Sequence, residues 1–207
     1  MVRSVQQIRY ADSFLPEEAV FAGGCKEKRI PIVLSFYLLQ TDTRTVLVDA
    51  GCDDLPGFVM LERCSPVEAL HRHGVSPEQV TDIIITHAHH DHIDGVRYFP
   101  NACVYLQRDE YAAGKQYLSD RVQVITFAQE QTVDDCLDIV RVGGHSKGSC
   151  VVEFDYEGRR CVIAGDECYS TENLIRRIPT ATCFDAQKSQ AFIDRYASGD
   201  YRVYLLH

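Results

Sequence analysis

A run of histidines and one aspartate directly after a buried strand constrains this chain more than any other feature. Residues 80–85 form a short, β-branched apolar run, which is typical of a buried strand. Four of the eight histidines follow between positions 87 and 92, in the pattern His-x-His-x-Asp-His. Gly95 and Pro100 then break the pattern, so we expect the cluster on a loop at the strand's carboxyl end. Ligand sites gather at that end of open α/β sheets, and imidazoles with a carboxylate are ligands that zinc takes.

The composition indicates a single globular domain over residues 1–207. The chain is 45% hydrophobic and 25% charged, which suits one substantial core, and it contains no repeat or Pro-rich linker. A formal net charge of -9 disfavours nucleic acid and anionic membranes as partners, because both reward a basic surface. No apolar run approaches the ~18 residues of a membrane span, and the first residues lack the apolar core of a signal peptide. We therefore expect a cytoplasmic protein; the sequence does not predict its oligomeric state.

Nine cysteines are many for this length. Their number is odd and no Cys-x-x-Cys pair occurs, which in a reducing compartment favours small core residues over disulfides. Cys52 and Cys168 closely follow candidate site residues, so contact with the site stays open for both.

The rest of the chain alternates predicted strands with short helices. Strands are expected at 5–10, 32–39, 45–48, 102–106, 122–127, 137–142, 150–154, 161–164 and 201–206. Helices are expected at 66–73, 109–117 and 186–196. Residues 41–44 form a turn, so the second and third strands are predicted to pair as a hairpin, and the stretch between 127 and 137 is expected to be a polar connection.

Five predicted strands run into a histidine or an aspartate. These strand-end residues are Asp49, His87, His145, Asp166 and His207. A carboxylate before glycine, as at Asp49, predicts a hydrogen-bond acceptor that supports a metal-bound histidine from behind. Glycines on both sides of His145 let the backbone turn and present the ring. One histidine alone is more often structural, but several arriving together predict a metal site.

This series of residues resembles the five motifs of the metallo-β-lactamase fold superfamily over nearly the whole chain. The resemblance implies an α/β fold, a four-layer αβ/βα sandwich in which two mixed sheets face each other with helices outside and metal at one edge. It also implies a ligand set, in which one metal ion is held by His87, His89 and His145, the other by Asp91, His92 and His207, and Asp166 bridges them. The cofactors would be two divalent metal ions, most readily Zn²⁺, although iron and manganese also suit these ligands.

The chemistry that the resemblance implies is hydrolysis by a hydroxide that bridges the two ions. Two divalent cations exceed the charge of two carboxylates and hydroxide by one unit, and this surplus stabilises the oxyanion formed at a carbonyl. Asp166 would carry the proton to the leaving group, and Tyr169 would donate its phenol hydrogen to the substrate; a packed tyrosine is the alternative for Tyr169.

Within the superfamily, the chain is most similar to the N-acyl homoserine lactonase-like group. Asp166-x-x-Tyr169 and Phe184-Asp185 match that group's bridging aspartate with its tyrosine and its Phe-Asp before the last helix. His89 stands where flavodiiron proteins carry glutamate, and zinc β-lactamases lack the bridge that Asp166 provides. The resemblance therefore predicts a hydrolase whose partner is a small-molecule lactone or ester. A thioesterase of the glyoxalase II kind, a phosphodiester hydrolase and a non-catalytic metal-binding protein are the alternatives.

Three positions depart from this group's pattern. Lys147 replaces a proline and either binds an anionic group of the substrate or is an ordinary solvated lysine, and Ser149 replaces a second histidine. The sequence stops at His207, where the family continues with Asp; a terminal carboxylate at that residue would be ionised beside the site.

Overall fold

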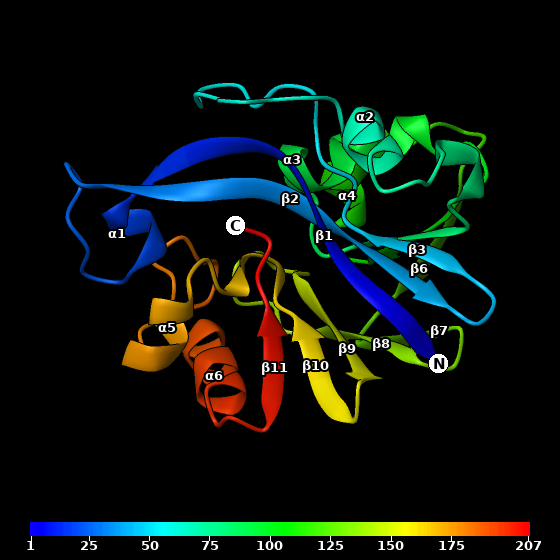
Figure 1. Ribbon diagram of the computed structural model, residues 1–207. Helices are drawn as coiled ribbons and strands as arrows, with labels where there is room; N and C mark the ends of the chain where they lie inside the picture. The colour runs from blue at the N-terminus through cyan, green and yellow to red at the C-terminus, as the bar shows by residue number, and fades with distance from the viewer.

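Two β-sheets face each other in the computed structural model, which describes residues 1–207 (Figure 1). The first sheet contains, in spatial order, β1 (Val2–Pro16), β2 (Arg29–Thr41), β3 (Thr45–Val48), β4 (Asp82–Ile85), β5 (Cys103–Gln107) and β6 (Gln123–Phe127). The second contains β11 (Tyr201–Tyr204), β10 (Arg159–Ile163), β9 (Cys150–Tyr156), β8 (Leu137–Arg141) and β7 (Glu130–Val133). Both are mixed: β3 to β6 run parallel beyond the antiparallel β1–β2–β3 meander, and β11 pairs parallel with β10.

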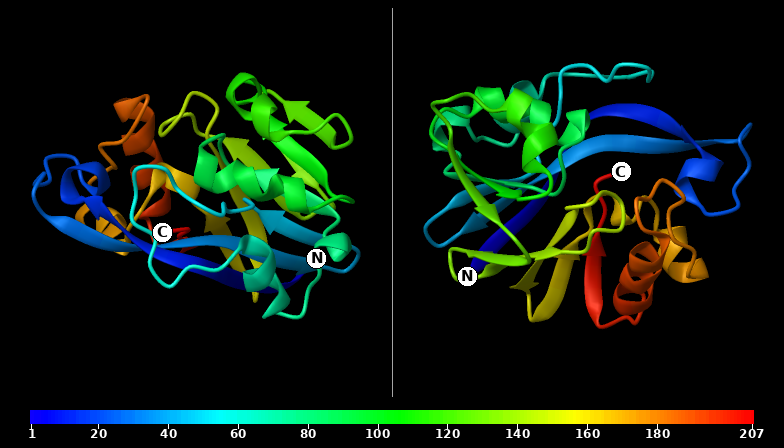
Figure 2. Two further views of the ribbon diagram at one scale, coloured as in Figure 1. Left: turned by 90° about the horizontal axis from the view of Figure 1, so that it is seen from above. Right: turned by 180° about the vertical axis from the view of Figure 1, so that it is seen from behind.

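Short helices lie on the outer faces of the two sheets, except α1, which lies at the end of the β1–β2 pair, in the connection between these strands (Figures 1 and 2). The α-helices are α1 (Glu17–Val20), α2 (Pro66–His71), α3 (His90–Ile93), α4 (Tyr111–Gly114), α5 (Thr171–Arg176) and α6 (Ala186–Tyr196). The 3₁₀ segments are η1 (Pro77–Gln79), η2 (Asp94–Tyr98), η3 (Lys115–Tyr117) and η4 (Gly165–Glu167). Helices α2, α3 and α4 accompany the first sheet, and α5 and α6 accompany the second.

Strand periodicity explains why the molecule has four layers. Successive side chains of a strand point to opposite faces, so a strand buried on both faces feeds two cores. In β2, Leu38 packs in an outer core with Leu70 of α2, whereas its neighbour Leu39 packs in the central core between the sheets. In the second sheet, Val152 joins the central core and Val151 packs against Phe192 of α6. Three cores between four layers give the αβ/βα sandwich that the resemblance implied, and that prediction is confirmed.

The structure corrects several expected elements. The hairpin of β2 with β3 and helix α6 are confirmed, but the expected polar connection contains β7, whose polar Glu130–Val133 run forms an edge strand. An edge strand needs only one paired neighbour and one buried face, so its sequence lacks a strong apolar signal. The predicted 109–117 helix is divided between α4 and η3, and part of the expected His/Asp loop is the one-turn helix α3.

Two further sequence expectations concern the cysteines and the membrane. All nine cysteines are free, but fewer than half are core residues: Cys52, Cys150, Cys161 and Cys168 are buried, Cys25 is exposed, and the other four, Cys103 among them, are only partly buried. None of the helices combines the length and apolar character needed to span a bilayer.

Candidate metal centre

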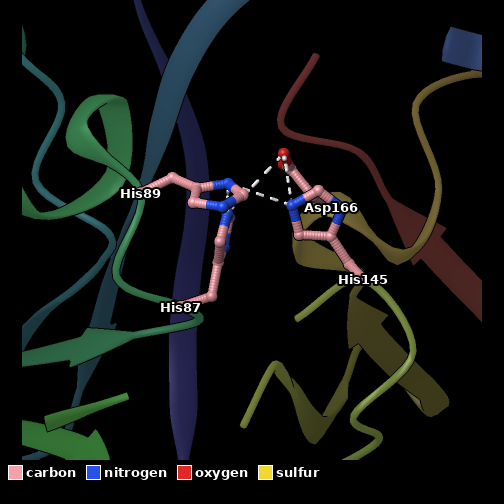
Figure 3. A group of neighbouring side chains, drawn as sticks. All are labelled: His87, His89, His145 and Asp166. Carbon is pink, nitrogen blue, oxygen red and sulfur yellow. Dashed lines mark hydrogen bonds and ion pairs between the residues drawn. The ribbon is translucent and has the colours of Figure 1, made fainter. Parts of the chain in front are cut away.

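Three histidines and one aspartate converge between the two sheets (Figure 3). His87 and His89 follow β4 of the first sheet, while His145 and Asp166 follow β8 and β10 of the second. One potential ligand atom from each residue lies within 4.8 Å of the others. His89 Nδ1 is 2.8 Å from His87 Nε2 and 3.1 Å from His145 Nε2. We refer to these four residues as cluster 1.

A second group, cluster 2, lies beside the first and contains Asp91, His92 and His207. Their ligand atoms also lie within 4.8 Å of one another. Helix α3 supplies the first two residues, and His207 comes from the other sheet, three positions after β11. Both clusters therefore draw ligands from both halves of the chain.

The carboxylate of Asp166 faces both clusters at once. Its Oδ2 lies 3.7 Å from His87 Nε2 and 3.6 Å from His145 Nε2, in cluster 1. Its Oδ1 lies 3.2 Å from His92 Nε2 and 3.0 Å from His207 Nε2, on the side of cluster 2. One oxygen toward each cluster is the arrangement that a bridging carboxylate requires.

Hydrogen bonds at the far side of three rings set their tautomers. The Nδ1 atoms of His92, His145 and His207 contact Asp49 Oδ2 at 2.8 Å, the Thr182 carbonyl oxygen at 2.8 Å and the Val33 carbonyl oxygen at 3.1 Å. Carbonyl and carboxylate oxygens only accept, so each Nδ1 carries a proton and donates it. In the neutral rings, all three Nε2 lone pairs consequently point into the centre.

This donor set fits divalent metal ions. A neutral imidazole nitrogen that faces a carboxylate oxygen is repelled by it unless a cation lies between them, and the Nε2 atoms of His92, His145 and His207 all face Asp166. His92 Nε2 is buried and makes no hydrogen bond of normal geometry. Imidazoles oriented from behind by carboxylate and carbonyl groups are the usual ligands of zinc. The residues present thus match the two divalent ions expected from the sequence.

The two clusters differ in electrostatics. Burial and the neighbouring His92 lower the pKa of His87, and burial also lowers that of His89. Burial opposes the charged form of His92 too, but the carboxylates of Asp166, Asp91 and Asp49 outweigh it and raise its pKa well above the ordinary value. For His207, Asp166 likewise outweighs burial and raises the pKa. His92 and His207 of cluster 2 therefore hold protons more strongly than His87 and His89 of cluster 1.

Metal binding at cluster 2 is expected to release protons near neutral pH, because a ligating imidazole must be neutral. The pKa of His92 is raised and that of His87 is lowered, so in the metal-free protein His92 keeps its proton to a higher pH than His87 does. As the pH is lowered, the affinity of cluster 2 for metal should accordingly fall about tenfold per pH unit for each proton that binding releases. The affinity of cluster 1 should fall less. Titration calorimetry in buffers of different ionisation enthalpy measures the proton count for each metal; equal counts near zero would contradict this expectation.

Asp49 lies behind a ring of cluster 2, where its place at a strand end predicted a supporting acceptor. It accepts hydrogen bonds from His92 Nδ1 at 2.8 Å, from the Thr86 amide at 2.7 Å and from Thr86 Oγ1 at 2.8 Å. Its φ of 64° is left-handed, a conformation that aspartate adopts more readily than most residues. Gly95 permits the neighbouring backbone to pass, since a Cβ there would lie 2.0 Å from the Ala50 carbonyl oxygen. The carboxylate joins the strand end to a ring of cluster 2.

Two buried glutamates that the sequence interpretation missed brace the loop carrying His145. Glu110 accepts from the Ala88 amide at 2.9 Å and from the Gly148 amide at 2.7 Å, so it joins the two ligand-bearing loops. Glu167 accepts from the His145 amide at 3.0 Å and from Ser149 Oγ at 2.5 Å. Burial raises the pKa of Glu167. The position of Glu167, directly after Asp166 at a strand end, could have identified it as a site residue from the sequence. Nothing in the sequence around Glu110 indicated such a role.

The first sheet holds the segment that carries His207. Tyr37 Oη and Gln7 Nε2 donate to the Leu205 carbonyl oxygen at 2.8 and 3.0 Å, and Ser35 Oγ donates to the Leu206 carbonyl oxygen. His207 is therefore fixed by contacts between the sheets, although it lies outside any strand.

The centre forms one end of a cavity of about 430 Å³. Its apolar lining consists of Leu15, Pro16, Ala19, Ile32, Leu34, Leu55 and Phe58, mostly from β1, β2 and the loop after β3. Its polar lining consists of His89, His90, Asp91, His145, Asp166, Tyr169, Thr182 and His207. Tyr169 Oη donates to Asp166 Oδ2 at 2.9 Å, and burial beside that carboxylate raises the pKa of the phenol well above its ordinary value.

Three residues singled out in the sequence belong to neither cluster. Lys147 does not line the cavity; its ammonium pairs with Asp109 Oδ1 at 3.1 Å and its side chain is 61% exposed, so the suggested contact with substrate is not supported. Cys52 Sγ contacts Tyr10 Oη at 3.7 Å, and Cys168 Sγ contacts the Ser170 carbonyl oxygen at 3.3 Å. Neither thiol belongs to a cluster.

Comparisons with known proteins agree with this geometry. The family model of the metallo-beta-lactamase superfamily matches residues 31–206. An N-acyl homoserine lactonase, AiiB of Agrobacterium fabrum, is 26% identical over 138 residues, which are 57% of this chain and 50% of the relative. An N-acyl homoserine lactonase of a Bacillus species is 28% identical over 184 residues, which are 77% of this chain and 73% of the relative. The matched region thus spans about half of the first relative's length.

Solved structures show the same fold. A quorum-quenching N-acyl homoserine lactone lactonase superposes with a TM-score of 0.86 at 23% identity, covering 99% of this chain and 92% of the other. AidC, a dizinc quorum-quenching lactonase, superposes with a TM-score of 0.76 at 17% identity, covering 100% of this chain and 88% of AidC. Because the family model matches the chain from β2 to the residue before His207, the chain belongs to the metallo-β-lactamase superfamily.

Proposed function

We propose that this protein is a metal-dependent hydrolase that opens a lactone, with N-acyl homoserine lactones as the first substrates to test, or cleaves a related carboxylic ester. The observation that carries the proposal is the position of Asp166, with one oxygen toward each of two clusters at the end of a half-apolar cavity. The lactonases among the relatives support the same reaction class.

The proposed ligands are divided between two ions. His87, His89 and His145 would hold one, Asp91, His92 and His207 the other, with Asp166 shared. When bound, two such ions supply a hydroxide nucleophile at neutral pH and a positive charge for the developing oxyanion. Zinc is the proposed metal, and iron or manganese would also suit the ligands.

The chain's own residues handle the proton and the substrate oxygen. Asp166 is proposed to take up the proton released during attack and deliver it to the leaving oxygen, as general acid–base groups do. Tyr169 stays protonated, because its pKa is raised, and its O–H is available to move from Asp166 Oδ2 to a substrate oxygen. Both side chains line the cavity, so each can reach a bound carbonyl.

The cavity lining favours a neutral substrate with an apolar substituent. No lysine or arginine lines it, and the walls away from the clusters are aliphatic or aromatic. An acyl chain gains about 25 cal/mol for each Å² of apolar surface that it buries there. A phosphodiester would find no protein cation, so ester or lactone hydrolysis is the better-supported reaction.

A substrate panel tests the proposed function. Metal-loaded protein is assayed with N-acyl homoserine lactones, simple esters, a thioester and a phosphodiester, with the chelated protein as the control. We expect the lactone or ester to give the highest kcat/KM. A higher value for the thioester would favour the glyoxalase II-like alternative, and no turnover of any compound would favour a non-catalytic metal-binding protein.

Metal stoichiometry gives a separate prediction. Seven potential ligands in two clusters should bind two ions per chain. Elemental analysis of protein purified without added metal, and again after loading, measures the number and identity of the ions. A plateau at one ion per chain after loading would contradict the assignment of cluster 2.

A further inference from the structure

His90 lies inside the His-x-His-x-Asp-His run but belongs to neither cluster. It is the first residue of α3, between the proposed ligands His89 and Asp91, and it lines the same cavity. Its side chain is 28% exposed. Both of its ring nitrogens contact protein groups from other segments.

The contacts of His90 join two segments across the ring. Nε2 lies 2.9 Å from the Asp54 carbonyl oxygen, and Nδ1 lies 3.3 Å from Tyr117 Oη. A carbonyl only accepts, so Nε2 carries the proton and donates it, and Nδ1 accepts from the phenol. The rings of His90 and Tyr117 also pack, with centroids 5.6 Å apart. Tyr117 thus holds the imidazole on one side, and on the other side the imidazole donates a hydrogen bond to Asp54, in the loop after β3.

Residues 54–60, here the 54–60 loop, form one wall of the cavity through Leu55 and Phe58. The loop is flanked by Asp53, which accepts from Arg97 at 2.9 Å, and by Leu61, which pairs with Asp12 at 2.9 and 2.8 Å. Between these points, its hydrogen bonds are the one from His90 to Asp54 and an internal turn from the Phe58 amide to the Leu55 carbonyl oxygen. One side chain therefore provides the loop's hydrogen bond to the rest of the protein.

We propose that His90 is a positioning and specificity-determining residue that latches the 54–60 loop against the cavity. The latch connects the apolar wall directly to the backbone of the ligand run. A long acyl group buries more of its surface against Leu55 and Phe58 than a short one, so fixing the loop favours long apolar substrates. This second part rests on the proposed function; the latch itself does not.

Amide hydrogen exchange in the metal-loaded protein tests the latch without any assay of activity. His90→Phe keeps a ring against Tyr117 but loses the donor to Asp54, and the Phe58 and Leu61 amides should exchange about five-fold faster, the factor that one ordinary hydrogen bond represents. His90→Gln places an amide donor near the position of Nε2 and should restore slow exchange. His90→Asn is the matched control, with the same group on a shorter side chain, and should behave like the phenylalanine variant.

Exchange within two-fold of the wild type in both His90→Phe and His90→Asn would overturn the latch, as would equal rates in the asparagine and glutamine variants. The Val162 amide in β10, far from the loop in sequence and in the other sheet, is the internal reference in each sample.

The specificity part is tested on decanoyl and butanoyl homoserine lactones. The ratio of kcat/KM for the long and the short substrate should fall about five-fold in His90→Phe and recover in His90→Gln. An unchanged ratio in an active enzyme would overturn the specificity role. If neither lactone is hydrolysed by the wild type, the proposed function fails, while the exchange rates still decide the latch.

Discussion

Replacing Asp166 with asparagine is expected to lower kcat by about 100-fold or more, the loss typical of a missing acid–base group. The amide keeps the size of the side chain but can neither bridge two cations as an anion nor carry the proton to the leaving oxygen. Steady-state kinetics at saturating metal measures the effect across pH. The loss should appear mainly in kcat, because the apolar walls that bind the substrate are unchanged.

The stability and metal content of Asp166→Asn distinguish a chemical role from a structural one. The folded protein should persist, because asparagine keeps the size of the side chain and its amide can still contact the four histidines that surround it. Asp82→Asn is a matched control, since Asp82 is equally buried at the opposite end of β4 and pairs with Arg44 at 3.4 Å. Activity of Asp166→Asn within about three-fold of the wild type would sink the proposed role of the carboxylate.

Replacing Asp49 with asparagine should weaken metal binding at cluster 2 by about 10- to 100-fold, the usual cost of losing the partner behind a ligating imidazole. The carboxylate accepts the proton of His92 Nδ1 and two bonds from Thr86. An amide retains one accepting oxygen. If that oxygen serves the Thr86 amide, the partner of Oδ1, then His92 Nδ1 loses the acceptor that fixes its tautomer; if it serves His92 Nδ1 and Thr86 Oγ1, the partners of Oδ2, the negative charge behind the ring is still lost.

Metal titration of Asp49→Asn should show a changed second binding step and a nearly unchanged first. Cluster 1 depends on Asp49 only indirectly, through Thr86, whose Oγ1 lies 3.2 Å from His87 Nδ1. Asp82→Asn again serves as the comparison, with a change in thermal stability but not in metal affinity. A parallel weakening of both steps would show that Asp49 supports the whole loop rather than His92.

The sequence predicted the sandwich and the residues that meet in the centre because their signals are local. Buried strands such as β4 show as apolar runs, and the residues after them carry the ligand chemistry in a fixed spacing. The amphipathic α6 was predicted to the residue, and in the structure the side chain of Asp185 caps the amides of Gln187 and Lys188 at its start. Membership of the superfamily followed from these positions and is confirmed by the family model.

What the sequence did not show depends on contacts between distant segments. Glu110 is far from every motif, and only the fold brings it to the amides of Ala88 and Gly148. The cavity wall is formed by β1, β2 and the 54–60 loop, none of which carries a site motif. Lys147 is a position that the sequence left open between a substrate contact and an ordinary solvated lysine; only the fold shows its ammonium paired with Asp109, outside the cavity lining.

Because each cluster takes ligands from both halves of the chain, metal binding is coupled to the association of the two sheets. Each cluster takes part of its set from residues 87–92 and the rest from residues 145–207, so neither half alone offers a full set. Bound ions would therefore act as clamps between the sheets, and their binding free energy would oppose separation of the sheets rather than unfolding of either one. Chelation should loosen the contact between the two sheets first, with the protection of amides in the central core falling before that in the cores under α2 and α6.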